Sequence, residues 1–167
     1  MPFRAPNSSK RKIRVVVTAI TVIIACTSAD EPASTRQEDM VAVSRMLVTL
    51  DRLAAEGDVA GLLEYISDDA VFMPPGSNTI VGSRQIGAWF GEVFDDFNVE
   101  ISHEPLETDA FGSIIVHRGD VTGTLQPKSG AASIAFDNKY LFVIRKHTDD
   151  SLKIWRAIFS NNPARPE

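Results

Sequence analysis

The sequence has 167 residues, of which 44% are hydrophobic and 8% aromatic, a size and composition typical of one globular domain with its own core. The formal net charge of −5 is unevenly distributed, because five basic residues precede the first acidic residue, Asp30. Setting those five aside from the 17 Lys and Arg leaves 12 against 22 Asp and Glu, a balance of −10. Such an acidic surface repels phosphate backbones, so we expect no nucleic-acid partner.

The first 26 residues have the layout of a secretory signal, because a cationic segment precedes the apolar run Val15 to Ala25. A membrane-spanning helix needs roughly 20 apolar residues, so we expect export and cleavage rather than an anchor. Cys26 directly follows Ile23-Ile24-Ala25, which resembles the lipobox of bacterial lipoproteins and implies lipidation of Cys26 in the cell envelope. The alternative is ordinary cleavage, for example after Ala29, and a secreted or periplasmic product. As the only cysteine, Cys26 cannot form a disulfide within the chain.

Residues 27–37 are small, polar and proline-containing, which is typical of a flexible tether, and we expect the folded domain to span residues 38–163. Thr35 and Glu38 have the spacing of a capping box. Apolar residues then recur three and four apart, which predicts an amphipathic helix that ends at Gly57. These apolar residues are Met40, Val43, Leu47, Leu50 and Ala54.

A second helix, a short strand and a third helix are expected next. Asp58 can cap the second helix, which we expect to run through Ile66. The run Ala70 to Met73 predicts a strand that ends at Pro74-Pro75, because proline cannot donate to a sheet ladder. Ser83 is expected to cap the third helix, whose apolar residues form a broad stripe.

From Val99 onward the apolar period is two, which predicts strands near residues 99–106, 114–124, 134–146 and 152–161. Helices followed by hairpin-linked strands define an α+β fold with a long-stranded, strongly curved antiparallel sheet. Gly119 and Gly123 lie within one of these strands, where glycine marks a bend or bulge more often than a phosphate loop.

This order of elements resembles the NTF2-like superfamily, especially its SnoaL-like, DUF4440 and ketosteroid-isomerase-like branches. The resemblance rests on LAAEGDVAGLLEYISDDAVFMPPG at residues 53–76, on Val81-Gly82, and on the closing stretches KYLFVIRK and KIWRAIFSNNP. It implies a cone in which three N-terminal helices pack on a strongly curved, mostly antiparallel sheet. The superfamily includes isomerases, cyclases, hydrolases and binding or assembly domains, so the resemblance leaves the function open.

The chemistry of ketosteroid isomerase needs a carboxylate base and two donors to an enolate oxygen. A gapless alignment from the Gly57-Asp58 corner places Pro74 at the position of the base and Leu50 at that of the tyrosine donor. Phe142 falls at the position of the protonated aspartate, or Tyr140 does if the alignment shifts by two residues. At least two of the three groups are absent, so we do not expect steroid isomerisation.

The same alignment places Phe142 and Phe159 on the concave face of the sheet. Strand alternation then predicts that residues an even number of positions away on the same strand also face the concave side. Together with one aromatic residue of the third helix, these side chains would line a cavity for a small apolar or amphipathic ligand. The alternative is that the aromatic rings fill the core. The expected ligand-binding residues are Trp89, Asn138, Tyr140, Phe142, Trp155 and Phe159.

The histidines His103, His117 and His147 lie on different strands without the spacing of metal ligands, so we expect neither a metal site nor a cofactor. His117, Asp120 and Tyr140 are candidates for acid–base catalysis. Strand alternation, however, sends His117 and Asp120 to opposite faces of the sheet.

Three functions are compatible with the sequence. The first is an exported domain that binds a small apolar or amphipathic molecule in its cone and touches membranes only through its N-terminal signal or lipid. The second is an isomerase, cyclase or hydrolase with an unrecognised acid–base pair. The third is a pocketless assembly module, in which the polar outer sheet face with Asp137, Lys139 and Arg145 pairs two copies into a homodimer, as related folds do.

Overall fold

The computed structural model describes residues 33–163. The expected signal segment 1–26, with Cys26, lies outside the described residues. Among the described residues, no helix is both long enough and apolar enough to cross a membrane. The elements are α1 (Ala33–Glu56), α2 (Val59–Leu63), β1 (Ile66–Met73), β2 (Ile80–Val81), α3 (Ser83–Asp96), β3 (Phe97–Phe111), β4 (Ile114–Pro127), β5 (Ile134–Lys146) and β6 (Leu152–Asn161).

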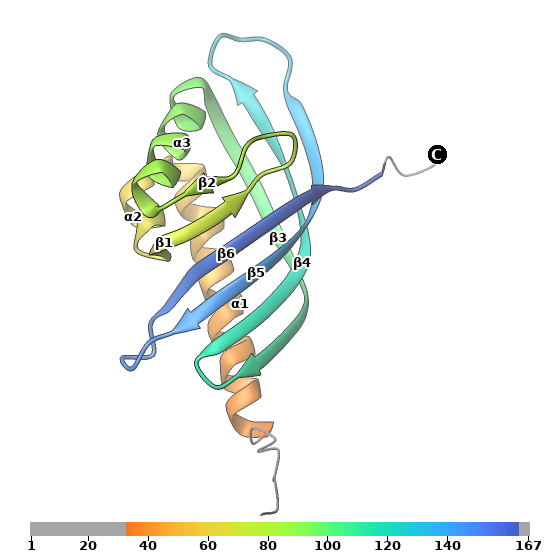
Figure 1. Cartoon of the computed structure of the whole chain (residues 1–167). Helices are drawn as coiled ribbons and strands as arrows, with labels where there is room; N and C mark the ends of the chain where they lie inside the picture. Colours follow the sequence, from red (N-terminus) through yellow and green to blue (C-terminus); the bar gives the residue numbers. More distant parts are fainter. Residues whose placement is uncertain (1–32, 164–167) are drawn as a thin grey trace, which may run out of the picture.

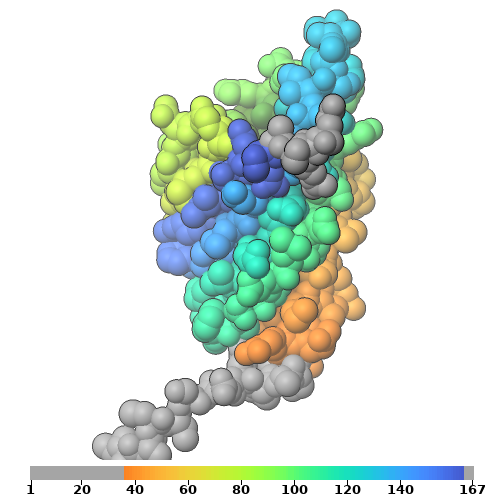
Figure 2. Space-filling model, turned by 90° about the vertical axis from the view of Figure 1, so that its right-hand side faces the viewer, coloured from red at the N-terminus to blue at the C-terminus, as the bar shows by residue number. Residues whose placement is uncertain are grey.

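The six strands form one sheet in the order β2-β1-β6-β5-β4-β3. Neighbouring strands are antiparallel except β1 and β6, which run parallel. In Figure 1 the curved sheet lies in front of α1, while α2 and α3 lie beside β1 and β2. Figure 2 shows the strands as adjacent bands across the molecule, with α1 in orange at the margin. The expected α+β cone with a mostly antiparallel sheet is confirmed.

The helix α1 packs its apolar stripe against the concave side of the sheet. Val43, Leu47 and Leu50 are buried as expected, but Met40 is 41% exposed. Asp39 takes the inward position of the first turns instead, where its Oδ1 accepts a hydrogen bond of 2.9 Å from Lys146 Nζ at the end of β5. The stripe therefore begins with a buried ion pair rather than with an apolar contact.

The start of α1 also differs from the expectation, because the helix begins at Ala33 and contains Thr35. The predicted capping box is therefore wrong, and residues 33–37 of the predicted tether are helical. Alanine, arginine and glutamine are good helix formers, and three of these five residues are of those types. Helix propensity accounts for the earlier start.

The side chain of Asp58 caps α2 as predicted, since its Oδ1 accepts a hydrogen bond of 2.9 Å from the backbone N–H of Gly61. The helix ends at Leu63, and Ile66 begins β1 beside Ile154 of β6. The expected end of this helix at Ile66 and the expected start of the strand at Ala70 are therefore wrong. A buried isoleucine fits both a helical and a strand pattern of apolar residues, and the pairing with β6 places it in the strand.

The helix α3 begins at Ser83, with Gly82 as its N-cap and no side-chain cap, so the predicted capping role of Ser83 is wrong. Gly82 has a φ of 88°, which glycine adopts without steric cost, and its N–H donates to the carbonyl of Ala70. This backbone bond holds the start of α3 against β1. The two-residue strand β2 precedes it and is too short to show a period in the sequence.

Two glycines of β4 allow the sheet to curve. Gly119 lies opposite Tyr140 of β5, and Gly123 lies opposite Phe136. A Cβ atom at Gly119 would lie 2.3 Å from the backbone oxygen of Glu104 in β3 and 2.5 Å from the Tyr140 hydroxyl. Rings and neighbouring backbone thus occupy the space that side chains would need, as expected for glycines at a bend.

We expect Gly119→Ala to lower the free energy of unfolding by about 1–3 kcal/mol, because the added methyl group has backbone on one side and a buried ring on the other. Gly91→Ala is the matched control, since a Cβ there meets nothing within 4 Å in the middle of α3. This control should raise stability by up to roughly 1 kcal/mol. Urea denaturation of both variants measures the difference, and equal stabilities would contradict this account of the curvature.

Candidate functional site

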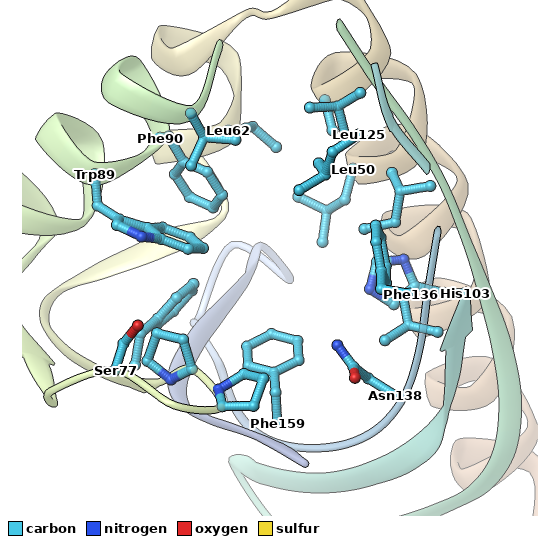
Figure 3. Close-up of a pocket in the computed structure, with 18 of the residues that line it drawn as sticks. Leu50, Leu62, Ser77, Trp89, Phe90, His103, Leu125, Phe136, Asn138 and Phe159 are labelled. Atoms are coloured by element: carbon cyan, nitrogen blue, oxygen red, sulfur yellow. The ribbon is translucent and has the colours of Figure 1, made fainter. Parts of the chain in front are cut away.

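The concave face of the sheet and the helices enclose a cavity of about 380 Å³. Side chains from the three helices, from β1 and from β3 to β6 line it, and Figure 3 shows Trp89 and Phe90 of α3 across the cavity from Phe136 of β5. Within residues 33–163, no Lys, Arg, Asp or Glu lines it. The aromatic side chains that line the cavity are Phe72, Trp89, Phe90, Phe94, Phe136, Phe142 and Phe159.

The predicted binding residues separate into three groups. Trp89, Asn138, Phe142 and Phe159 line the cavity. Tyr140 also points to the concave side, but its side chain is buried beneath the lining and is only 3% exposed. The cavity stays open because the rings stand at its walls. Phe142 and Phe159, for example, meet edge to face with centroids 5.6 Å apart.

The expected concave position of Trp155 is wrong, because its side chain lies on the outer face of the sheet. Ile154 pairs with Ile144 and Arg156 pairs with Val143, so Trp155 is the extra residue of a β-bulge that reverses the alternation from Phe159. The Trp155 ring lies 4.0 Å from the guanidinium carbon of Arg145 and 3.9 Å from that of Arg156. Its indole Nε1 donates to Asp69 at 3.0 Å.

Leu50, Pro74 and Phe142 all line the cavity. These are the three positions that the alignment with ketosteroid isomerase assigns to its base and its two donors. The cone therefore keeps the position of that site but holds no ionisable group at any of the three residues.

Among the described residues, one ionisable side chain lines the cavity, that of His103 of β3, and it is paired with Asp51 of α1. The His103 Nδ1 lies 2.5 Å from Asp51 Oδ1, and the backbone N–H of His103 donates to Asp51 Oδ2 at 3.2 Å. A carboxylate accepts hydrogen bonds, so Nδ1 carries a proton in this arrangement. The His103 side chain is 7% exposed and lines the cavity. The pair therefore holds an oriented imidazole at an apolar wall.

A second polar network lies behind the lining. His117 is fully buried, with Nδ1 2.9 Å from Thr108 Oγ1 and Nε2 2.9 Å from the Tyr140 hydroxyl. The Tyr140 ring contacts the His103 ring edge to face at 5.1 Å. Hydroxyl groups can donate or accept, so both nitrogens of a neutral His117 are satisfied.

Burial sets the ionisation of this network. It lowers the pKa of His117 from 6.5 to about 4, and the neighbouring His103 acts in the same direction. It raises the pKa of the Tyr140 phenol, to which the charges of Asp51 and Asp120 add. Both groups are therefore neutral near pH 7. His117 and Tyr140 form a structural support for His103, while Asp120 lies on the opposite face of β4, as alternation predicted.

The sequence prediction missed Asp51 and His103 as a site. The two residues are 52 positions apart, one on a helix and one on a strand, so no local spacing connects them. The third histidine, His147, lies at the β5–β6 turn, where its N–H donates to the carbonyl of Ser151. Within the described residues, no group of three or more His, Cys, Asp or Glu has a metal-binding arrangement.

The SnoaL-like domain matches residues 27–157, so the chain belongs to the SnoaL-like domain family. No curated protein matches the sequence. A conserved protein from Planctomyces limnophilus has a similar structure, with a TM-score of 0.71 and 18% identity over 76% of this chain and 100% of its own.

Two other solved structures share the fold. A ketosteroid isomerase-like protein from Erwinia carotovora atroseptica has a TM-score of 0.67 and 20% identity, over 75% of this chain and 98% of its own. An NTF2-like superfamily protein from Salmonella enterica has a TM-score of 0.63 and 18% identity, over 80% of this chain and 94% of its own. At these identities the likeness establishes the NTF2-like fold.

The buried His117 predicts a specific loss of stability in acid. In the unfolded chain histidine titrates near 6.5, whereas folded His117 titrates near 4, so the unfolded state binds more protons between these values. Stability should therefore fall by about 3 kcal/mol as the pH decreases from about 6.5 to 4, in addition to other acid effects. His117→Gln keeps a hydrogen-bonding side chain without this titration. Urea midpoints of both proteins across that range provide the measurement, and parallel curves would contradict the assignment.

Proposed function

We propose that this chain is an exported protein that binds a small, largely apolar molecule in the cone between its sheet and its helices. The cavity of about 380 Å³ with an almost wholly apolar lining carries the proposal. Cavities of this size and character are typical of small-molecule sites. The apolar run Val15 to Ala25 after a basic segment supports export, and Cys26 supports a lipid anchor in the cell envelope.

The arrangement of rings favours a flat ligand. Phe90 and Phe94 of α3 stack with centroids 5.8 Å apart and face the sheet, where Phe142 and Phe159 stand. Removing about 250 Å² of ligand surface from water contributes on the order of 6 kcal/mol at roughly 25 cal/mol per Å². The entropic cost of association reduces this gain. We therefore expect dissociation constants between about 0.1 mM and 1 mM for simple aromatic hydrocarbons.

A variant whose side chain fills the cavity tests the proposal. Biphenyl should bind the wild-type domain saturably in isothermal titration calorimetry, and Ala54→Phe should weaken binding by at least about tenfold, because Ala54 lines the cavity and the new ring occupies it. Ala88→Phe is the matched control, since Ala88 is exposed on α3, and it should bind like the wild type. No saturable binding to a folded wild-type domain would reject the proposal.

Acid–base catalysis by His103 and Asp51 is a second candidate function. The observation that favours it is the 2.5 Å contact between His103 Nδ1 and Asp51 Oδ1, which orients an imidazole that lines the cavity. In this arrangement His103 Nε2 is the catalytic base and Asp51 is a positioning residue. Such a pair can accept a proton from a bound molecule, and imidazole is the side chain that enzymes use most often for this purpose.

Deuterium exchange at the carbon beside a ketone tests this candidate. In D₂O we expect the wild type to speed exchange of 2-tetralone by roughly 10²-fold over His103→Gln. Asp51→Asn should also slow exchange while leaving tetralone binding in place, because it disturbs the orientation of His103 and not the apolar walls. Equal exchange rates for wild type and His103→Gln, with tetralone bound to both, would rule out this base.

A further inference from the structure

Three polar side chains lie in one row along the sheet wall of the cavity, at right angles to the strands. His103 of β3 lies opposite Val121 of β4, Val121 lies opposite Asn138 of β5, and Asn138 lies opposite Asn161 of β6. All four residues line the cavity. Sheet register thus places three polar groups at one level on a wall whose other side chains are apolar.

The three polar residues of the row also lie at different depths in the cavity. Asn161 is exposed, Asn138 is half-buried, and the His103 side chain is 7% exposed. Ser77 is another exposed lining residue and, with Asn161, marks the mouth of the cavity. The row therefore runs from the mouth to the interior, and Figure 3 shows Asn138 and His103 on the same wall, across from Trp89.

The chemistry of these groups restricts the ligand. Asparagine amides both donate and accept, so they can bind a hydroxyl or a ketone oxygen. The lining contains no Lys, Arg, Asp or Glu, so a charged ligand would lose its hydration without gaining an ion pair at the wall. An unsubstituted hydrocarbon would leave the amides of Asn138 and the ring nitrogen of His103 without partners in the cavity.

The distance between the polar groups and the volume of the cavity limit the size of the ligand. Neighbouring strands lie about 4.8 Å apart, so His103 and Asn138, two strands apart, are separated by roughly 10 Å along the row. A cavity of about 380 Å³ has the volume of roughly a dozen water molecules at about 30 Å³ each, which suits a molecule of two or three rings.

We propose that the cone selects a neutral ligand of two or three rings that carries oxygen groups at both ends, one bound by His103 in the interior and one by Asn138 and Asn161 near the mouth. This inference rests on the proposed binding function and specifies its ligand class. The apolar walls supply affinity for the rings, and the row determines their orientation.

Three probes of similar shape separate the contribution of the apolar walls from that of the polar row in isothermal titration calorimetry. 4,4′-Dihydroxybiphenyl should bind about tenfold more tightly than biphenyl, since each good hydrogen bond contributes on the order of 1 kcal/mol. 4′-Hydroxybiphenyl-4-carboxylate, an anion at neutral pH, should bind more weakly than the diol. Equal affinities for the diol and biphenyl would overturn the proposal, and so would a preference for the anion. Failure of biphenyl itself to bind would instead reject the underlying binding function.

Variants of the row provide the residue-level test. Asn138→Leu and Asn161→Leu should each reduce the roughly tenfold advantage of the diol over biphenyl by about two- to threefold, because only the diol uses the amides. The exposed position of Asn161 on β6 makes its variant the safer one for folding. Asn98→Leu is the matched control, because Asn98 is exposed on β3 outside the cavity lining. Losses of equal size for both probes would contradict a role in ligand selection.

Discussion

The curvature of the sheet is the constraint on which the rest of the structure depends. At Gly119 and Gly123, β4 has no side chain on its inner face, and the backbone of β3 and the rings of β5 occupy that space. The strands can then bend around α1 and α3 instead of packing flat against them. Because the inner wall is concave, helices that cover it cannot fill the space at its centre, and a cavity remains between two aromatic walls.

Polar groups in this interior lie at two depths, and they serve different purposes. His117 and Tyr140 are hydrogen-bonded to each other behind the lining, where burial keeps both neutral. His103 lies in front of them, lines the cavity and is oriented by Asp51. Buried polar groups are costly unless they are paired, and pairing of this kind is what allows an imidazole at an apolar wall.

Much of the fold could be predicted from the sequence, because long amphipathic elements have clear periods and Asp58 follows capping rules. The alignment with ketosteroid isomerase placed Phe142 and Phe159 on the inner wall, where they line the cavity. Trp155 could not be placed, because a bulge adds one residue and reverses the faces of β6 before it. The Asp51–His103 pair and the row of His103, Asn138 and Asn161 depend on pairing between distant segments, which no local pattern shows.

Intermolecular nuclear Overhauser effects between bound biphenyl and the methyl groups of the protein show whether the ligand lies in the cone or on the surface. Val121 and Leu125 line the cavity, whereas Val41 and Val48 are exposed on the outer side of α1. We expect contacts from biphenyl protons to the methyl groups of Val121 and Leu125. Contacts confined to Val41 and Val48 would show that the hydrocarbon binds the surface and would contradict a ligand-binding cone.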